Sequence, residues 1–259
     1  MPYVTRDVDI YYVQAGVPNT EAIFFCHGAG GNSTSWWQQV PEFATSYRCL
    51  AHDHRGFGRS RCTGEQFVVG EFAGDVLAVM DAEGVESAHF VCQSMGGWTG
   101  VQVALNHPDR IRSLVLSDTI GGIALQSGVD SIVTMAERAE RLGAISPALA
   151  PDYPRTNPPG TFLYTEISAF NTSFEDLLIF QKMFSTEGLV PLERARELGL
   201  PVLIFAGRND IIWPPETLHE LAGHISGARV VDIDSGHSPY FENPVAFNSA
   251  LREFLLQLA

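Results

Sequence analysis

Ser94 lies between a short apolar run and a pair of glycines. Residues 90–92 (Phe-Val-Cys) predict a buried strand, and Gly96 and Gly97 begin a predicted helix. A serine at such a tight turn has a strained backbone, small neighbours and a helix N-terminus behind it. This arrangement, a nucleophile elbow, suits a hydroxyl that attacks a carbonyl carbon. The usual pattern is Gly-x-Ser-x-Gly, and Cys92 replaces the first glycine here.

The elements that would position Ser94 alternate between strands and helices. Strands are predicted at residues 8–13, 22–26, 47–51, 90–92, 111–116, 201–206 and 229–233, and helices at 35–43, 72–80, 96–106, 215–225 and 244–258. Polar loops follow most strands, at 27–32, 53–60, 117–119, 207–210 and 234–237. Mostly apolar strands in this order predict a mostly parallel sheet covered by helices on both faces. A site is then expected at the carboxyl ends of the strands.

Residues 121–185 interrupt this alternation. They hold predicted helices at 129–142 and 174–184, separated by a proline-rich middle, and no strand that ends in a polar loop. We therefore expect a core of residues 1–120 and 186–259, with a helical cap or lid at 121–185.

Composition limits the classes of function. The apolar fraction of 45% is that of a protein with a packed core, and the formal net charge is -14. This charge disfavours nucleic acid and anionic membrane surfaces as partners. No apolar run reaches the length of a membrane span, and the first residues lack a signal-peptide core. The 4 cysteines form no Cys-x-x-Cys pair, which favours reduced thiols in a cytoplasmic protein.

Four motifs in this order resemble the α/β-hydrolase family. They are His27-Gly28, Asp53-x-Arg55-Gly56-x-Gly58-x-Ser60, the Ser94 elbow and Gly236-His237. The resemblance covers nearly the whole chain. It implies the α/β-hydrolase fold, with a mostly parallel eight-stranded sheet and helices on both faces. It also implies a catalytic serine, acid and histidine in that chain order, which Ser94, Asp210 and His237 satisfy.

The chemistry explains why the family needs these types. A serine hydroxyl is a weak nucleophile, so His237 is the candidate base for its proton, and Asp210 the candidate carboxylate that orients the imidazole. The oxyanion formed during attack needs two fixed donors. By resemblance these are the backbone N–H groups of Met95 and, in the loop after His27-Gly28, Ala29. Trp37 and Trp213 adjoin the motifs and are candidates for contact with substrate.

Several residues compete for these roles. Asp118 also follows a strand, at a position where some family members carry their acid. Cys92 is a poor alternative nucleophile because it lies inside the predicted strand. His52, Asp53 and His54 could suggest a metal site, but strand alternation points successive side chains to opposite faces, and no further ligand cluster accompanies them. We therefore expect no bound metal and no cofactor.

The sequence predicts a cofactor-free serine hydrolase that acts on a small-molecule ester or lactone. Within the family it looks most like 3-oxoadipate enol-lactonases and related carboxylesterases. Arg138, Arg141 and Arg155 are candidate partners for a substrate carboxylate. The alternatives are a C–C bond hydrolase of ring-cleavage products, disfavoured by Ser238 after His237, a non-catalytic ligand receptor, and a lyase or perhydrolase. The oligomeric state stays open, with a homodimer as one option.

Overall fold

The computed structural model describes residues 2–18, 20–171 and 176–258. Its strands are β1 (Tyr3–Thr5), β2 (Asp9–Gly16), β3 (Ala22–Cys26), β4 (Arg48–His52), β5 (Ala88–Gln93), β6 (Ile111–Ser117), β7 (Val202–Gly207) and β8 (Arg229–Ile233). Its α-helices are α1 (Val40–Phe43), α2 (Phe72–Ala82), α3 (Gly96–Asn106), α4 (Gln126–Leu142), α5 (Tyr153–Thr156), α6 (Pro158–Ala169), α7 (Asp176–Met183), α8 (Pro215–His224), α9 (Pro239–Glu242) and α10 (Pro244–Leu256). Short 3₁₀ helices are η1 (Ser33–Trp36), η2 (Val69–Glu71), η3 (Pro108–Arg110) and η4 (Leu192–Glu197).

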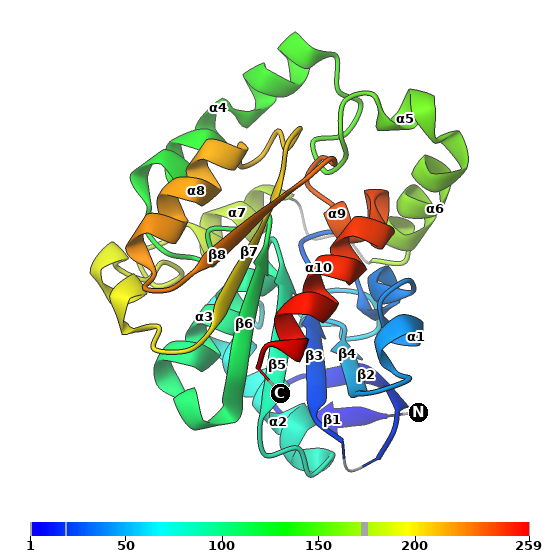
Figure 1. The fold of residues 1–259 in the computed structure, drawn as a ribbon, viewed down its shortest axis with the longest axis vertical. Helices are drawn as coiled ribbons and strands as arrows, with labels where there is room; N and C mark the ends of the chain where they lie inside the picture. The colour runs from blue at the N-terminus through cyan, green and yellow to red at the C-terminus, as the bar shows by residue number, and fades with distance from the viewer. Residues whose placement is uncertain (1, 19, 172–175, 259) are drawn as a thin grey trace.

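One eight-stranded sheet organises the described residues (Figure 1). The strand order is β1-β2-β4-β3-β5-β6-β7-β8; β1 and β2 pair antiparallel, and the strands from β4 to β8 pair in parallel. This confirms the predicted fold class. β5 lies near the middle of the sheet, so the turn that carries Ser94 is surrounded by other strand ends.

The sheet is buried because alternate residues of its strands enter two separate cores. Phe24 and Leu114 pack in one core with residues of α2, α3 and α8. Phe25 and Val115 pack in the other with residues of α1 and α10. This alternation explains why the central strands are apolar throughout. Three of the four cysteines, Cys26, Cys49 and Cys92, are buried in strands, as predicted, and all four are free thiols.

Some elements differ from the prediction. The expected helix at 35–43 is divided into η1 and α1, since Pro41 lacks an N–H and begins a new helix. The proline-rich middle of residues 121–185 contains α6, which starts with Pro158 and Pro159 in its first turn, where their missing N–H groups cost nothing. The first part of the helix expected at 174–184 lies outside the described residues.

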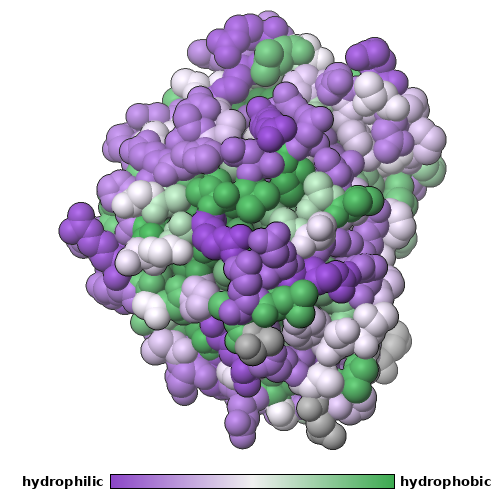
Figure 2. Space-filling model, viewed as in Figure 1, coloured by the Kyte–Doolittle hydropathy of each residue, from purple (hydrophilic) through white to green (hydrophobic). Residues whose placement is uncertain are grey.

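In Figure 1, α4 runs along the upper left of the molecule, and α5 and α6 lie at its upper right. On the face in Figure 2, hydrophilic residues cover most of the helices, and hydrophobic residues gather across the middle, between α8 and α10. Within the described part of the chain, no helix is both long and apolar enough to cross a lipid bilayer.

Candidate active site

Ser94 occupies the turn between β5 and α3 in a left-handed backbone conformation, with φ of 48°. Asp118 is the one other described non-glycine residue with positive φ. The turn is held on both sides, because the Ser94 N–H donates to the Ser117 carbonyl (3.0 Å) and the Thr119 hydroxyl donates to the Ser94 carbonyl (2.7 Å). A Cβ on Gly96 would lie 2.2 Å from the Cys26 carbonyl oxygen, so any side chain there would force β3 or α3 to shift. The predicted elbow is thus present.

Cys92 fits this turn because α3 leaves space for it. Its side chain is fully buried, and its Sγ would lie 2.6 Å from a Cβ placed on Gly100. The missing side chain at Gly100 therefore makes room for the sulfur atom. The departure from the usual glycine changes the packing beneath Ser94 and leaves the strained turn in place.

The structure brings His237 and Asp210 together. His237 Nδ1 lies 2.9 Å from Asp210 Oδ2, and both side chains are buried. The other oxygen, Oδ1, accepts the N–H groups of Ile212 (2.7 Å) and Trp213 (3.2 Å), which fix the carboxylate. His237 Nε2 is buried and has no hydrogen-bond partner among the described residues. This pair therefore presents one free ring nitrogen, oriented by a carboxylate.

Gln93 joins the histidine loop to the elbow. It is the last residue of β5 and precedes Ser94, and its side-chain amide donates to the His237 carbonyl oxygen at 3.0 Å. The loops that carry Ser94 and His237 are thereby held side by side. Sequence reasoning missed this residue, because nothing local indicates a partner 144 positions along the chain.

Asp118 lies near the pair but bonds elsewhere. Its Oδ1 accepts the Gly207 N–H (2.7 Å), and its Oδ2 accepts the Ser117 hydroxyl (3.0 Å). Burial, and then the nearby Asp210 carboxyl, raise the pKa of Asp118 well above its usual value. Among the described hydrogen bonds, none joins Asp118 to His237. The geometry therefore favours Asp210 over Asp118 as the partner of the imidazole.

The loop after β3 approaches the elbow closely. The Gly31 N–H donates to the Gly28 carbonyl (3.0 Å) and closes a turn around Ala29, which is exposed. A Cβ on Gly28 would lie 2.8 Å from Ser94 Cβ. Met95 is buried at the N-terminus of α3, where the first N–H groups have no acceptor within the helix. The two expected donor loops therefore border Ser94.

His27 supports this loop as a neutral side chain. Its Nε2 accepts the His54 N–H (2.9 Å), so Nδ1 carries the proton that is donated to the Gly28 carbonyl (2.7 Å). Burial lowers the pKa of His27 to about 4, and burial also lowers the pKa values of His52 and His54 well below the usual value. These histidines stabilise the loop by neutral hydrogen bonds.

The His-Asp-His run forms part of the core. His52 Nε2 lies 3.2 Å from His54 Nδ1. Asp53 accepts the N–H groups of Ser33 (2.6 Å) and Arg59 (2.8 Å), which orders the loop beside the Gly28 turn. In the described ranges, no group of three or more His, Cys, Asp or Glu side chains is arranged to hold a metal ion.

The two tryptophan candidates lie in different surroundings. Trp213 is buried, its ring centroid lies 5.6 Å from that of His237, and its indole N–H donates to the Gly128 carbonyl (3.1 Å). Trp37 follows η1 and is 47% exposed. Trp213 thus forms a wall beside the histidine, and the role of Trp37 stays a prediction.

The arginines of residues 121–185 do not share a site. The Arg138 guanidinium bonds to the Ile211 carbonyl (2.9 Å) and the Ser131 hydroxyl (3.0 Å), which ties α4 to the loop of Asp210. Arg155 is exposed and lies 4.0 Å from Asp152. Arg141 is exposed as well. The Arg138 guanidinium is therefore already engaged in hydrogen bonds that stabilise the structure next to Asp210.

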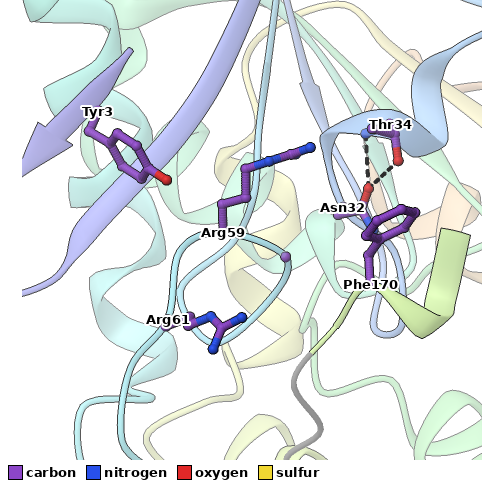
Figure 3. A pocket seen from close by; sticks show the side chains of 7 residues that line it. Tyr3, Asn32, Thr34, Arg59, Arg61 and Phe170 are labelled. Carbon is purple, nitrogen blue, oxygen red and sulfur yellow. Dashed lines mark hydrogen bonds between the residues drawn. The ribbon is translucent and has the colours of Figure 1, made fainter. Parts of the chain in front are cut away.

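A cavity of about 420 Å³ lies beside the loop that follows β3 (Figure 3). Its lining residues are Tyr3, Asn32, Thr34, Gly58, Arg59, Arg61 and Phe170. In Figure 3 the Asn32 side chain accepts hydrogen bonds from Thr34, next to Phe170. Ser94, Asp210 and His237 do not line this cavity.

Comparison with known proteins identifies relatives of this chain. Residues 21–159 match a family model described as the alpha/beta hydrolase fold. A 2-hydroxymuconate semialdehyde hydrolase of Pseudomonas sp. (strain CF600) is 30% identical, over 99% of this chain and 95% of its own.

Solved structures show the same relationship. An N-acyl homoserine lactone degrading enzyme superposes with a TM-score of 0.82 at 28% identity, covering 98% of this chain and 100% of its own. The enol-lactonase of Burkholderia xenovorans superposes with a TM-score of 0.81 at 26% identity, with the same coverage. The motifs that resembled this family therefore lie in a chain that matches it in sequence and in structure. The protein belongs to the α/β-hydrolase family, and the relatives named above include a hydrolase and an enol-lactonase.

Proposed function

We propose that this protein is a cofactor-free serine hydrolase that cleaves a carboxylic ester or a lactone. The observation that carries the proposal is the buried Asp210–His237 pair, whose free Nε2 belongs to a loop that Gln93 holds beside Ser94. A carboxylate, an imidazole with one free nitrogen and a serine on a strained elbow are the parts of an acyl-transfer site.

The reaction proceeds in two halves. His237 Nε2 takes the Ser94 hydroxyl proton as Oγ attacks the substrate carbonyl carbon, and the N–H groups of Met95 and Ala29 stabilise the oxyanion. The imidazolium then returns the proton to the leaving alkoxide, which leaves an acyl group on Ser94. Water, deprotonated by His237, then attacks the acyl carbon, and the imidazolium returns this proton to Ser94 Oγ as the acid is released. Asp210 keeps the imidazole in the required tautomer throughout.

Residues 121–185 act in this proposal as a cap over the strand ends. Trp213 would border the acyl or alcohol side of the substrate, since its ring lies against His237. Trp37 is the second proposed substrate contact. The similarity to a lactone-degrading enzyme and an enol-lactonase favours lactones within the ester class.

A second candidate is hydrolysis of a C–C bond. It is favoured by the 30% identity to a hydrolase of 2-hydroxymuconate semialdehyde, a substrate without an ester group. The same triad could serve this reaction, so the two candidates differ in the group that reaches Ser94. A third, a non-catalytic receptor on the same fold, would bind such ligands without turnover.

A substrate panel tests these candidates. Aryl esters of increasing chain length, several lactones and a vinylogous diketone are offered to the wild-type protein and to Ser94→Ala. We expect multiple turnovers of an ester or lactone by the wild type and at least a 1,000-fold loss in Ser94→Ala. Turnover of the diketone alone would favour C–C cleavage. Binding without turnover of any member would contradict the proposed hydrolase.

A further inference from the structure

Glu242 connects the histidine loop to residues 121–185. It ends the short helix α9, five positions after His237. One carboxylate oxygen, Oε1, accepts the N–H groups of Gly236 (3.0 Å) and Ser238 (3.2 Å), the two residues that flank His237. The other oxygen, Oε2, accepts the Ala150 N–H at 2.8 Å. A single side chain therefore fixes the backbone on both sides of the imidazole and joins it to a distant segment.

The surrounding contacts leave little freedom at this junction. A Cβ on Gly236 would lie 2.1 Å from the Ala150 nitrogen, so the two backbones touch. The Ser238 hydroxyl donates to the Ala148 carbonyl at 2.8 Å and lies 3.3 Å from the Tyr164 hydroxyl. The histidine loop and the segment at 148–150 are thus in direct contact. Glu242 accepts hydrogen bonds from three N–H groups that this contact would otherwise leave without an acceptor.

We propose that Glu242 is a positioning residue for catalysis. Its carboxylate holds the backbone on both sides of His237, and it couples the position of His237 to the contact that the cap makes at Ala150. The kinetic part of this inference rests on the proposed function. A carboxylate suits the task because two oxygens can accept three N–H groups, whereas a neutral side chain of the same length offers one acceptor.

The charges around Glu242 make the contact sensitive to pH. The groups that face it are Asp118 and Asp210 at the strand ends and the phenols of Tyr153, Tyr164 and Tyr240. Burial, reinforced by Asp210, raises the pKa of Glu242 to about 7, although its three N–H bonds oppose the shift. Protonation near neutral pH would replace one acceptor with an O–H and weaken the contact.

Two variants distinguish the bonds of Glu242 to Gly236 and Ser238 from its bond to Ala150. In Glu242→Gln, the remaining oxygen keeps the Gly236 and Ser238 bonds, and the amide NH₂ faces the Ala150 N–H. Glu242→Ala removes all three bonds. Glu83→Gln is the matched control, since Glu83 is also partly buried and bonds to Tyr12 and Arg48 away from the site.

Hydrogen exchange followed by NMR tests the geometry without any substrate. We expect the Ala150 amide to exchange at least 10-fold faster in Glu242→Gln, with Gly236 and Ser238 unchanged. All three should exchange faster in Glu242→Ala, and none in Glu83→Gln. Unchanged protection in the Glu242 variants would overturn the inference, even if the protein proved to be no hydrolase.

Kinetics on the best ester or lactone test the catalytic role. Because a small displacement of a catalytic group is costly, Glu242→Ala should lower kcat by about 100-fold, and Glu242→Gln should recover most of kcat while KM rises. The pH dependence gives a separate test. Below neutral pH, log(kcat/KM) of the wild type should fall with a slope greater than 1 per pH unit, because two groups gain a proton, whereas that of Glu242→Gln should fall with a slope of 1. If Glu242→Ala does not fold, the slope for Glu242→Gln and the exchange rate of its Ala150 amide test the inference. A Glu242→Gln variant with the same slope and the same KM as the wild type would overturn it.

Discussion

Asp118 and Asp210 follow neighbouring strands, yet of the two only Asp210 bonds to an imidazole of the described residues. Asp118 meets a backbone N–H and a hydroxyl, and burial favours its neutral form. The sequence makes both residues candidate acids, because each follows an apolar strand and nothing nearby in the sequence distinguishes them. The difference arises from tertiary contacts, since it depends on which loop His237 reaches.

Asp210→Asn tests the acid. The asparagine amide would face His237 Nδ1 with a donor or a weaker acceptor, so the imidazole would lose its required tautomer. We expect kcat to fall by about 10⁴-fold with little change in the free energy of unfolding. Steady-state kinetics and urea unfolding of the same preparation check both halves.

Asp118→Asn is the companion substitution. Asparagine can still accept the Gly207 N–H, and it replaces a carboxyl that is already biased toward its neutral form. The variant should keep kcat within about 10-fold of wild type and should be at least as stable at pH 8, where the buried carboxyl is costliest. A larger loss of kcat than in Asp210→Asn would transfer the catalytic role to Asp118.

At the scale of elements, the strand-to-helix turn depends on close backbone approach. Gly96→Ala would place a Cβ 2.2 Å from the Cys26 carbonyl oxygen, so β3 or α3 must shift. We expect a loss of roughly 1–3 kcal/mol in the free energy of unfolding, together with reduced activity. Gly223→Ala in α8 would meet no atom of the described part of the chain within 4 Å and is the control, with an expected gain of up to about 1 kcal/mol. Equal effects would contradict the packing described for the elbow.

Sequence patterns predicted most elements and the three proposed catalytic residues. The central strands are apolar runs that end in polar loops, and α10 begins at Pro244, where the helix expected at 244–258 was placed. β1 was missed because it has three residues and no buried one. α6 was missed because its prolines suggested a loop. Gln93 and Glu242 were missed because their partners are distant backbone groups, which leave no local signal.

At the scale of the molecule, residues 121–185 bond to each loop that borders Ser94. The Gly30 carbonyl accepts the Ser168 hydroxyl (2.9 Å), and the Ile212 carbonyl accepts the Ser131 hydroxyl (2.6 Å). Glu242 provides the third connection, at Ala150. Displacing this segment would therefore disturb the donor loop, the acid loop and the histidine loop together.

Buried histidines set the pH dependence of stability. Burial lowers the pKa values of four histidines: His27, His52, His54 and His89. Below about pH 6.5 the unfolded chain therefore binds protons that the folded protein does not bind. Stability is therefore present above that pH and is lost as pH falls toward about 4, where His27 titrates.

The two carboxyl groups with raised pKa values, Glu242 and Asp118, change the stability in the opposite direction as pH falls. Folded Glu242 and Asp118 keep protons that the unfolded chain releases, which offsets part of the histidine effect on acidification. Four histidines outweigh two carboxyls, so the free energy of unfolding should fall by on the order of 1–3 kcal/mol between pH 6.5 and 5. Urea unfolding across this range checks the sign, and a stability that rises over it would contradict the neutral histidine core.

Ser94 is the proposed nucleophile of this site, and every other proposed role depends on it. The most direct measurement is covalent labelling by a fluorophosphonate, followed by intact-mass and peptide-mass analysis of the wild type and of Ser94→Ala. We expect one adduct per chain, located on Ser94, and none on Ser94→Ala. A native protein that stays unlabelled, or a Ser94→Ala variant that is labelled equally, would contradict it.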